Sequence, residues 1–469
     1  MKPVLANLGF VLQTTGLLIL LAVVVAFLYD EKEAVISFFI SSVVFLGAGF
    51  LMNALCERKD LDFKSSCVLI TIVFFLLGAI GSIPYLYNNI FYDSDIISKI
   101  INSFFESVSG FTTTGLTFIS NPDSLPKSIV FYRSLTQWIG GIGIVFILLA
   151  FFYSERVLNS LSKAMGFESI TSTLKKTYIE VFLVYTIYVL IFIGVFYFFG
   201  IKDLLYNTSL VFSTISTGGF SPISNFSTFL SFPNNFILSI LMILGSTSFI
   251  VHHKLFTGKF GNAFTTEFIT LILIIFSFTI ILSILSNLDI ITAFFHSVSA
   301  STTTGYSFID FKYFSPSVKI LFIFLMFVGG CAFSTSGGIK ILRFLIFLKS
   351  IPWIIKGAIK GNLDKFTFEG KEFKTTDVLS YLLLILLAIS MIFSFAFVFT
   401  LYGFDFIDSI FELTSAFATT GISVGITNVS LPIVLKIVLV LVMVLGRIEI
   451  ITLLVAIMPL AKEEKLTNE

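Results

Sequence analysis

A short Thr/Ser-Thr-Gly turn occurs four times along the chain, at intervals of roughly one hundred residues. Each copy follows a short segment of mixed polarity and precedes a long apolar segment. One such turn is typical of an ordinary glycine-terminated helix end, but four copies in the same setting predict four repeated units. The copies are Thr113-Thr114-Gly115, Ser216-Thr217-Gly218, Thr303-Thr304-Gly305 and Thr419-Thr420-Gly421.

The long apolar segments predict an all-α polytopic membrane protein. Of 469 residues, 56% are hydrophobic, which is more than one soluble core could bury. A span needs about 20 residues. Runs that qualify lie near 8–28, 35–55, 66–88, 128–152, 178–200, 234–251, 267–286, 317–348, 377–402 and 431–458. The net charge of +1 gives no support for nucleic-acid binding.

The segments before the turns are too short to cross a bilayer at about 1.5 Å per residue. We expect them to be re-entrant half-helices, because the four linkers and both termini then fall on one side, with 20 of the 29 Lys and Arg. Basic residues concentrate on the cytoplasmic side, so both termini are predicted to be cytoplasmic. The half-helices are Ile96–Ser109, Asp203–Ser213, Asp289–Ala300 and Asp405–Ala416.

The predicted architecture is two extra N-terminal helices followed by four units, each a helix, a re-entrant pore helix and a helix, around one central ion pore. The boundaries are 1–64 for the N-terminal pair and 65–176, 177–266, 267–375 and 376–469 for the units. The basic linkers Lys340–Lys374 and Arg156–Lys176 are predicted cytoplasmic surfaces for a partner. Membrane lipid is the expected surrounding.

A ring of four such turns has the chemistry of a cation filter. Backbone carbonyls can replace the hydration shell of a monovalent cation, and glycine permits the dihedrals that such a turn requires. The C-terminal ends of the half-helices carry partial negative charge, which favours cations. We therefore expect Gly115, Gly218, Gly305 and Gly421 at one level, with ion-binding oxygens from the Thr and Ser residues before them: Thr113, Thr114, Ser216, Thr217, Thr303, Thr304, Thr419 and Thr420. Nine residues before each glycine lie Glu106, Ser209, His296 and Glu412, which we expect to be buried and hydrogen-bonded behind the filter.

In the third unit the long apolar run is interrupted by Gly329-Gly330-Cys331-Ala332-Phe333-Ser334-Thr335-Ser336-Gly337-Gly338. Paired glycines make a continuous helix costly, so an unwound intramembrane loop that gates the pore is predicted. A glycine-rich helix-packing seam is the alternative. Arg447 lies in the last apolar run and is predicted to reach this loop, while Glu449 finds another partner; snorkelling of Arg447 to the interface is the alternative.

Gly140, Gly141 and Gly143 suit close helix packing beside the first turn. Cys56, Cys67 and Cys331 have no metal-type spacing and are interpreted as reduced apolar residues. The sequence shows no nucleotide-binding motif and no catalytic arrangement, so an organic cofactor and an enzyme activity are not expected.

The chain resembles the potassium-translocating subunits of the bacterial Trk system, in the Trk/Ktr/HKT superfamily. The resemblance rests on Phe105–Gly115, Arg133–Gly143, Ile215–Ser221, Gly329–Lys340 and Gly446–Glu449, and it extends over essentially the whole chain. The two additional N-terminal helices are more similar to the Trk branch than to Ktr. One departure is Phe333, where the family pattern has a small residue, usually glycine.

This resemblance implies potassium (K+) uptake across the bacterial plasma (inner) membrane, with K+ as the transported ion at the threonine and serine positions named above. It implies a homodimer, in which each protomer has its own pore. It also implies a cytoplasmic, nucleotide-binding (NAD/ATP) regulatory ring of the TrkA type that acts on the 329–338 loop. All four filter glycines are present, which favours potassium over sodium. The alternative within transport is a sodium-permeable or ion-coupled (H+/Na+) symporter; the alternative outside it is a membrane enzyme.

Overall fold

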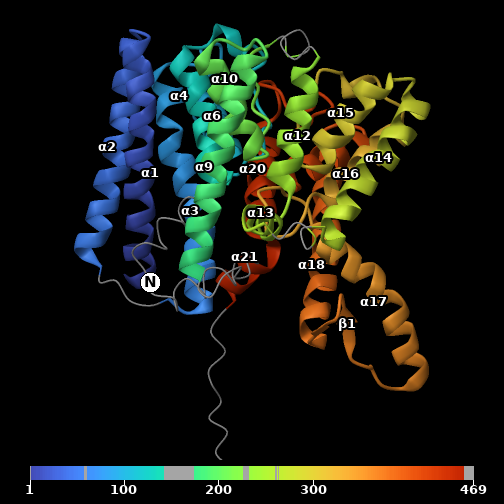
Figure 1. Cartoon of the computed structure of the whole chain (residues 1–469). Coiled ribbons are helices and arrows are strands. Elements are labelled where there is room, and N and C mark those ends of the chain that lie inside the picture. The colour runs from blue at the N-terminus through green and yellow to red at the C-terminus, as the bar shows by residue number, and fades with distance from the viewer. Residues whose placement is uncertain are drawn as a thin grey trace, which may run out of the picture.

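The computed structural model describes residues 2–56, 61–141, 174–224, 226, 232–258, 261 and 264–458. Within these residues the regular secondary structure is almost entirely helical, as predicted, and most of the helices run side by side along one direction (Figure 1). Six described helices are long and apolar enough to cross a membrane, and two further pairs qualify if each bent pair is counted as one span. The protein is therefore a multi-pass membrane protein.

The two extra N-terminal helices, α1 (Lys2–Leu28) and α2 (Lys32–Leu55), pack closely against each other along one flank. Small residues permit this approach, since a Cβ on Gly16 would lie 2.9 Å from the Cβ of Phe45. The pair is also fixed to the first unit. The carboxylate of Glu31, between α1 and α2, accepts hydrogen bonds from the backbone N–H groups of Lys127 (2.6 Å) and Ser128 (3.0 Å).

Four units follow in chain order. Unit 1 contains α3 (Phe63–Gly81), α4 (Ile83–Tyr87), α5 (Ile96–Phe111), η1 (Pro122–Ser124) and α6 (Lys127–Gly141), and unit 2 contains α9 (Leu174–Phe198), α10 (Leu204–Ile215), α12 (Asn234–Ser246) and α13 (Phe249–Phe256). Unit 3 contains α14 (Thr266–Ser286), α15 (Ile290–Ser301), η3 (Phe311–Tyr313), α16 (Pro316–Val328) and α17 (Ile341–Lys360). Unit 4 contains α18 (Thr375–Leu401), α19 (Phe406–Phe417), α20 (Ile433–Ile448) and α21 (Ile450–Ile457). Residues 142–173, which include Gly143 and most of the Arg156–Lys176 linker, lie outside the described part.

The predicted half-helices are α5, α10, α15 and α19. They contain 16, 12, 12 and 12 residues, which corresponds to about 18–24 Å and is too short for a hydrocarbon core of about 30 Å. An aspartate caps the start of each one and accepts hydrogen bonds from backbone N–H groups of the first turn. These caps are Asp95, Asp203, Asp289 and Asp405.

The last helices of units 2 and 4 are broken, where the sequence predicted continuous spans at 234–251 and 431–458. The axis turns by 104° between α12 and α13 and by 97° between α20 and α21. In unit 4 the break falls at Glu449, whose φ of 64° is incompatible with a right-handed helix. In unit 3 the helix ends at Val328 and restarts at Ile341, and this break is the one that the sequence predicted, at the 329–338 loop.

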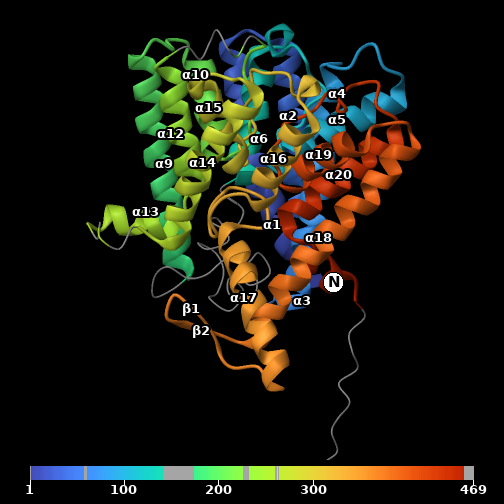
Figure 2. The same ribbon diagram turned by 90° about the vertical axis from the view of Figure 1, so that its right-hand side faces the viewer.

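The linker between units 3 and 4 is an ordered arm. α17 leads into a two-stranded antiparallel hairpin, β1 (Phe366–Phe368) and β2 (Lys371–Phe373), which the sequence did not predict. Phe366 and Phe368 are buried in a small separate cluster with Ile346 and Val378. The arm projects from the helical body at the same end as the N-terminus of α1 (Figures 1 and 2).

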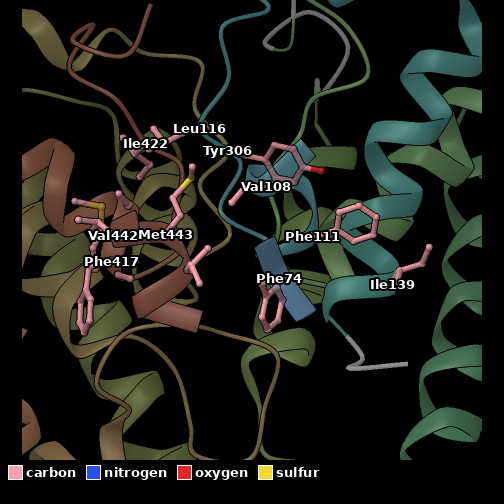
Figure 3. Packing of buried hydrophobic residues seen from close by; sticks show 14 of the residues in the cluster. Phe74, Val108, Phe111, Leu116, Ile139, Tyr306, Phe417, Ile422, Val442 and Met443 are labelled. Atoms are coloured by element: carbon pink, nitrogen blue, oxygen red, sulfur yellow. The ribbon is translucent and has the colours of Figure 1, made fainter. Parts of the chain in front are cut away.

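The main core surrounds the ends of the half-helices. Figure 3 shows buried side chains from α5, α19 and α20 in this region, among them Phe111, Phe417 and Met443. Leu116 and Ile422, each directly after a turn glycine, are also buried. Buried apolar side chains therefore directly follow the first and fourth turns.

Candidate functional site: four turns in a closed ring

The four turns meet in a closed ring. A Cβ added to the glycine of each turn would lie far inside van der Waals contact of a backbone carbonyl oxygen from the next turn. The pairs are Gly115 against Gly218 (2.2 Å), Gly219 against Thr304 (2.0 Å), Gly305 against Thr420 (1.6 Å) and Gly421 against Thr114 (2.3 Å). The contacts run through units 1, 2, 3 and 4 and return to unit 1, so the turns encircle one axis, and no side chain fits where the backbones touch.

The glycine of the second turn that occupies the equivalent place is Gly219, not Gly218. Gly219 has a φ of 76°, close to the values of 83°, 85° and 86° at Gly115, Gly305 and Gly421, whereas Gly218 has no such positive φ. The threonines two residues before these glycines share positive φ values of 48–56°. They are Thr113, Thr217, Thr303 and Thr419. The prediction that placed Gly218 at the common level is thus wrong by one residue, and Ser216 is the helix C-cap that corresponds to Thr112.

The buried acidic and histidine side chains behind the ring are hydrogen-bonded, as predicted. Glu106 accepts from the hydroxyl of Thr117 (2.8 Å) and from Nε of Arg133 (3.0 Å). Glu412 accepts from the hydroxyl of Ser423 (2.8 Å) and from two backbone N–H groups. Each carboxylate fixes the segment that follows its own turn.

In unit 3, Nε2 of His296 lies 3.4 Å from the backbone nitrogen of Phe308, in the segment after the third turn. The prediction for Ser209 is not confirmed. Its hydroxyl is buried, with no hydrogen-bond partner among the described residues. Because the second turn is shifted by one residue, the position nine before Gly219 is the apolar Leu210.

In the second unit, Gln137 makes the hydrogen bonds that fix the turn, and it was not predicted from the sequence. Its side-chain amide donates to the carbonyl of Gly218 (2.6 Å), and its oxygen accepts from the hydroxyl of Ser213 (2.6 Å) and the backbone N–H of Phe220 (3.2 Å). The sequence did offer a signal for Gln137, because it is a strongly polar, uncharged side chain in an apolar run, three residues before Gly140. The Cβ of an alanine at position 140 would lie 2.0 Å from the carbonyl oxygen of Phe111, which confirms the predicted packing beside the first turn.

The 329–338 loop lies against the base of the ring. The backbone N–H of Gly337 donates to Oγ1 of Thr303 (2.7 Å), and the hydroxyl of Thr335 lies 3.4 Å from that of Thr217. A Cβ on Gly337 would meet Oγ1 of Thr419 at 2.3 Å. The loop therefore touches the first threonine of three turns.

Arg447 joins this loop to the fourth and first units. Its guanidinium donates to the carbonyl oxygens of Thr335 (3.0 Å), Gly140 (2.7 Å) and Gly141 (3.2 Å). The predicted contact with the loop is present, and the alternative of a guanidinium snorkelling to the interface does not describe these three contacts with backbone carbonyls. Glu449 pairs with Arg343 at 2.7 Å, which is the separate partner that was expected.

Phe333 adopts a φ of 56°, a left-handed conformation that favours glycine. This explains why a small residue suits the position. The strain is opposed by packing, because the ring is 8% exposed and lies edge-on to Phe249, with 5.6 Å between centroids. The backbone carbonyl of Phe333 also accepts from the N–H of Phe249 (2.9 Å).

Comparison with known proteins agrees with this architecture. The profile of the TrkH family, described as cation transport proteins, matches residues 33–261 and 259–467. An uncharacterized cation transporter of Methanocaldococcus jannaschii is 34% identical over 97% of this chain and 94% of its own length. The Trk system potassium uptake protein TrkG of Escherichia coli is 26% identical, with 94% of each chain covered. The crystal structure of the potassium transporter TrkH from Vibrio parahaemolyticus superposes with a TM-score of 0.83 at 25% identity and covers 98% of each chain. Family, identity and fold agree over almost the full length, and this chain belongs to the TrkH family of cation transport proteins.

Proposed function

We propose that this protein takes up potassium across the plasma membrane through the ring of four turns. The closed ring of glycine-to-carbonyl contacts is the observation that carries the proposal, because it brings four segments that are far apart in the sequence to one axis. The choice of ion comes from two of the similar proteins described above, a potassium uptake protein and a potassium transporter. The filter consists of Thr113-Thr114-Gly115, Thr217-Gly218-Gly219, Thr303-Thr304-Gly305 and Thr419-Thr420-Gly421, with Ser216 at the inner end of the second turn.

Oxygen atoms without protein partners support ion binding at the inner end of this ring. The buried hydroxyls of Thr113 and Thr419 have no hydrogen-bond partner among the described residues. A buried hydroxyl left without a partner costs free energy, and a partly dehydrated K+ that crosses this level would offset that cost. The C-terminal ends of four half-helices direct partial negative charge toward the same place.

The 329–338 loop is the proposed gate. It lies against Thr217, Thr303 and Thr419 on one side of the ring, and Arg447 brings a positive charge to the same level. A cation leaving the filter would meet both the loop backbone and this charge. Movement of the loop away from the ring would remove the obstruction, and the guanidinium would lose one of its three carbonyl contacts.

The remaining organisation follows from this assignment. The basic arm at 340–375 lies at the same end of the molecule as the start of α1 (Figure 1), so the positive-inside rule supports a cytoplasmic N-terminus and a cytoplasmic arm. We propose that the protein forms a homodimer and that a cytoplasmic nucleotide-binding ring of the TrkA type acts on the loop through this surface. The division into 1–64, 65–176, 177–266, 267–375 and 376–469 then describes the N-terminal pair and the four pore units.

The test is potassium-limited growth and ion flux in a bacterial strain that lacks its own potassium uptake systems and also expresses the regulatory subunit. The wild-type protein is expected to restore growth and to move rubidium, and Gly115→Ser is expected to lose this activity or to shift it toward sodium. Well-expressed wild-type protein that moves neither potassium nor rubidium would refute the assignment. Flux that depends on external sodium or protons would instead indicate a coupled symporter.

A further inference from the structure

The first half of the 329–338 loop is held by three hydrogen bonds on successive residues. The N–H of Cys331 donates to the carbonyl of Ser246 (3.0 Å), and the carbonyl of Phe333 accepts from Phe249 (2.9 Å). Between them, the N–H of Ala332 donates to a carboxylate oxygen of Glu267 at 2.7 Å. Of these three bonds, only the middle one is made by a side chain, so it is the one that a substitution can remove without altering the backbone.

We propose that Glu267 is the positioning residue that holds this loop in its observed position beneath the filter. The inference rests on the proposed function only where it equates loop movement with gating. Glu267 lies in the first turn of α14. It acts on the ion pathway through the loop.

The hydrogen bond between Ala332 and Glu267 is a strong one. A hydrogen bond from a backbone N–H to an ionised carboxylate is roughly twice as strong as a neutral one. The N–H of Ala332 would otherwise have to be satisfied by another acceptor. The next residue, Phe333, has a φ of 56°, and strained backbone of this kind persists only where its surroundings fix it. The Glu267 carboxylate thus stabilises the loop beside its most strained residue.

The position of the contact also makes it accessible to control. Ala332 and Glu267 are both partly exposed, whereas the neighbouring Cys331 and Phe333 are buried. Any displacement of the start of α14 moves the carboxylate relative to the loop. The start of α14 is therefore connected to the loop by this hydrogen bond.

Cys331 provides a native reporter for this inference. Its thiol is fully buried in the seated loop, so alkylation by N-ethylmaleimide requires the loop to move. The experiment uses the full chain with Cys56→Ser and Cys67→Ser, in membrane vesicles, and measures both Cys331 alkylation and rubidium flux. Asp377→Ala is the matched control. Asp377 also lies in the first turn of a unit's first helix, α18, so this substitution removes the same kind of negative charge from a helix N-terminus.

Loss of a charge-assisted hydrogen bond in Glu267→Ala is expected to raise the Cys331 alkylation rate by roughly tenfold. Glu267→Gln keeps an acceptor oxygen and should fall between this variant and the wild type, so it also serves if Glu267→Ala does not fold. Asp377→Ala should match the wild type.

Unchanged alkylation in both Glu267 variants, or an equal increase in Asp377→Ala, would overturn the proposal. A selective increase in alkylation together with faster rubidium flux supports the positioning role and the gate. A selective increase in alkylation with unchanged flux supports the positioning role of Glu267 but refutes gating by the loop, so the two proposals fail separately.

Discussion

Gly305 is the position at which the ring geometry makes its sharpest prediction. The Cβ of Gly305→Ala would lie 1.6 Å from the carbonyl oxygen of Thr420, where real Cβ contacts are essentially never under 3.0 Å. The third and fourth turns must therefore separate by about 1.4 Å, the difference between these two distances. Binding sites tolerate displacements of only about 0.5 Å. In addition, the φ of 85° at Gly305 costs a residue with a Cβ about 1–2 kcal/mol.

We expect Gly305→Ala to abolish selective potassium transport while the rest of the fold is retained, because the strain is confined to the ring. Gly403→Ala is the matched control. Gly403 has a nearly identical φ of 88°, but a Cβ there would have nothing within 4 Å. It should lose about 1–2 kcal/mol of stability from backbone strain alone and transport normally.

The assay is rubidium and sodium flux into vesicles that contain equal amounts of each purified variant, together with thermal unfolding in detergent. Wild-type flux and selectivity in Gly305→Ala would refute the reasoning, since the backbone contacts would then not define the ion pathway. Equal loss of transport in Gly403→Ala would show that backbone strain anywhere disables the protein.

Two further outcomes follow from buried contacts near the ring. Glu106→Gln leaves Arg133 buried without its anionic partner and should cost about 3–5 kcal/mol of stability, measured as loss of folded, monodisperse protein. The double variant Glu106→Gln/Arg133→Met should recover most of this stability. A double variant as unstable as the single one would contradict this explanation. Phe333→Gly relieves about 1–2 kcal/mol of backbone strain but removes the buried ring that packs against Phe249, which contributes about 3–5 kcal/mol. The thermal unfolding temperature should therefore fall. A higher unfolding temperature would show that the relief of backbone strain is the larger effect.

Much of the architecture could be predicted from the sequence because its physical causes are local. An aspartate at the start of each half-helix and a glycine after its end define both boundaries, and Asp95 and Gly115 illustrate the pattern. Repetition then fixes the topology, since four copies of one unit must pack in the same way. The intramembrane loop was predicted for the same reason, from paired glycines within an apolar run.

The errors arose where local sequence allowed two solutions. Gly218 and Gly219 are adjacent, and only the contact of Gly219 with Thr304 decides which of them takes the positive φ. Gln137 was missed because its partners, Ser213 and Phe220, are 76 and 83 residues away. The break at Glu449 coincides with an ion pair to Arg343, 106 residues earlier in the chain, which periodicity does not reveal.

The closed ring is built from one chain, so its four quarters differ in sequence. At the level before the glycines, three threonines stand beside one glycine: Thr114, Thr304 and Thr420 with Gly218. In an assembly of identical subunits one mutation changes a whole layer, whereas here it changes a single quarter. Evolution can therefore change the residues that line the pore one at a time. Each substitution alters one residue of a layer, and the other three residues of that layer are unchanged.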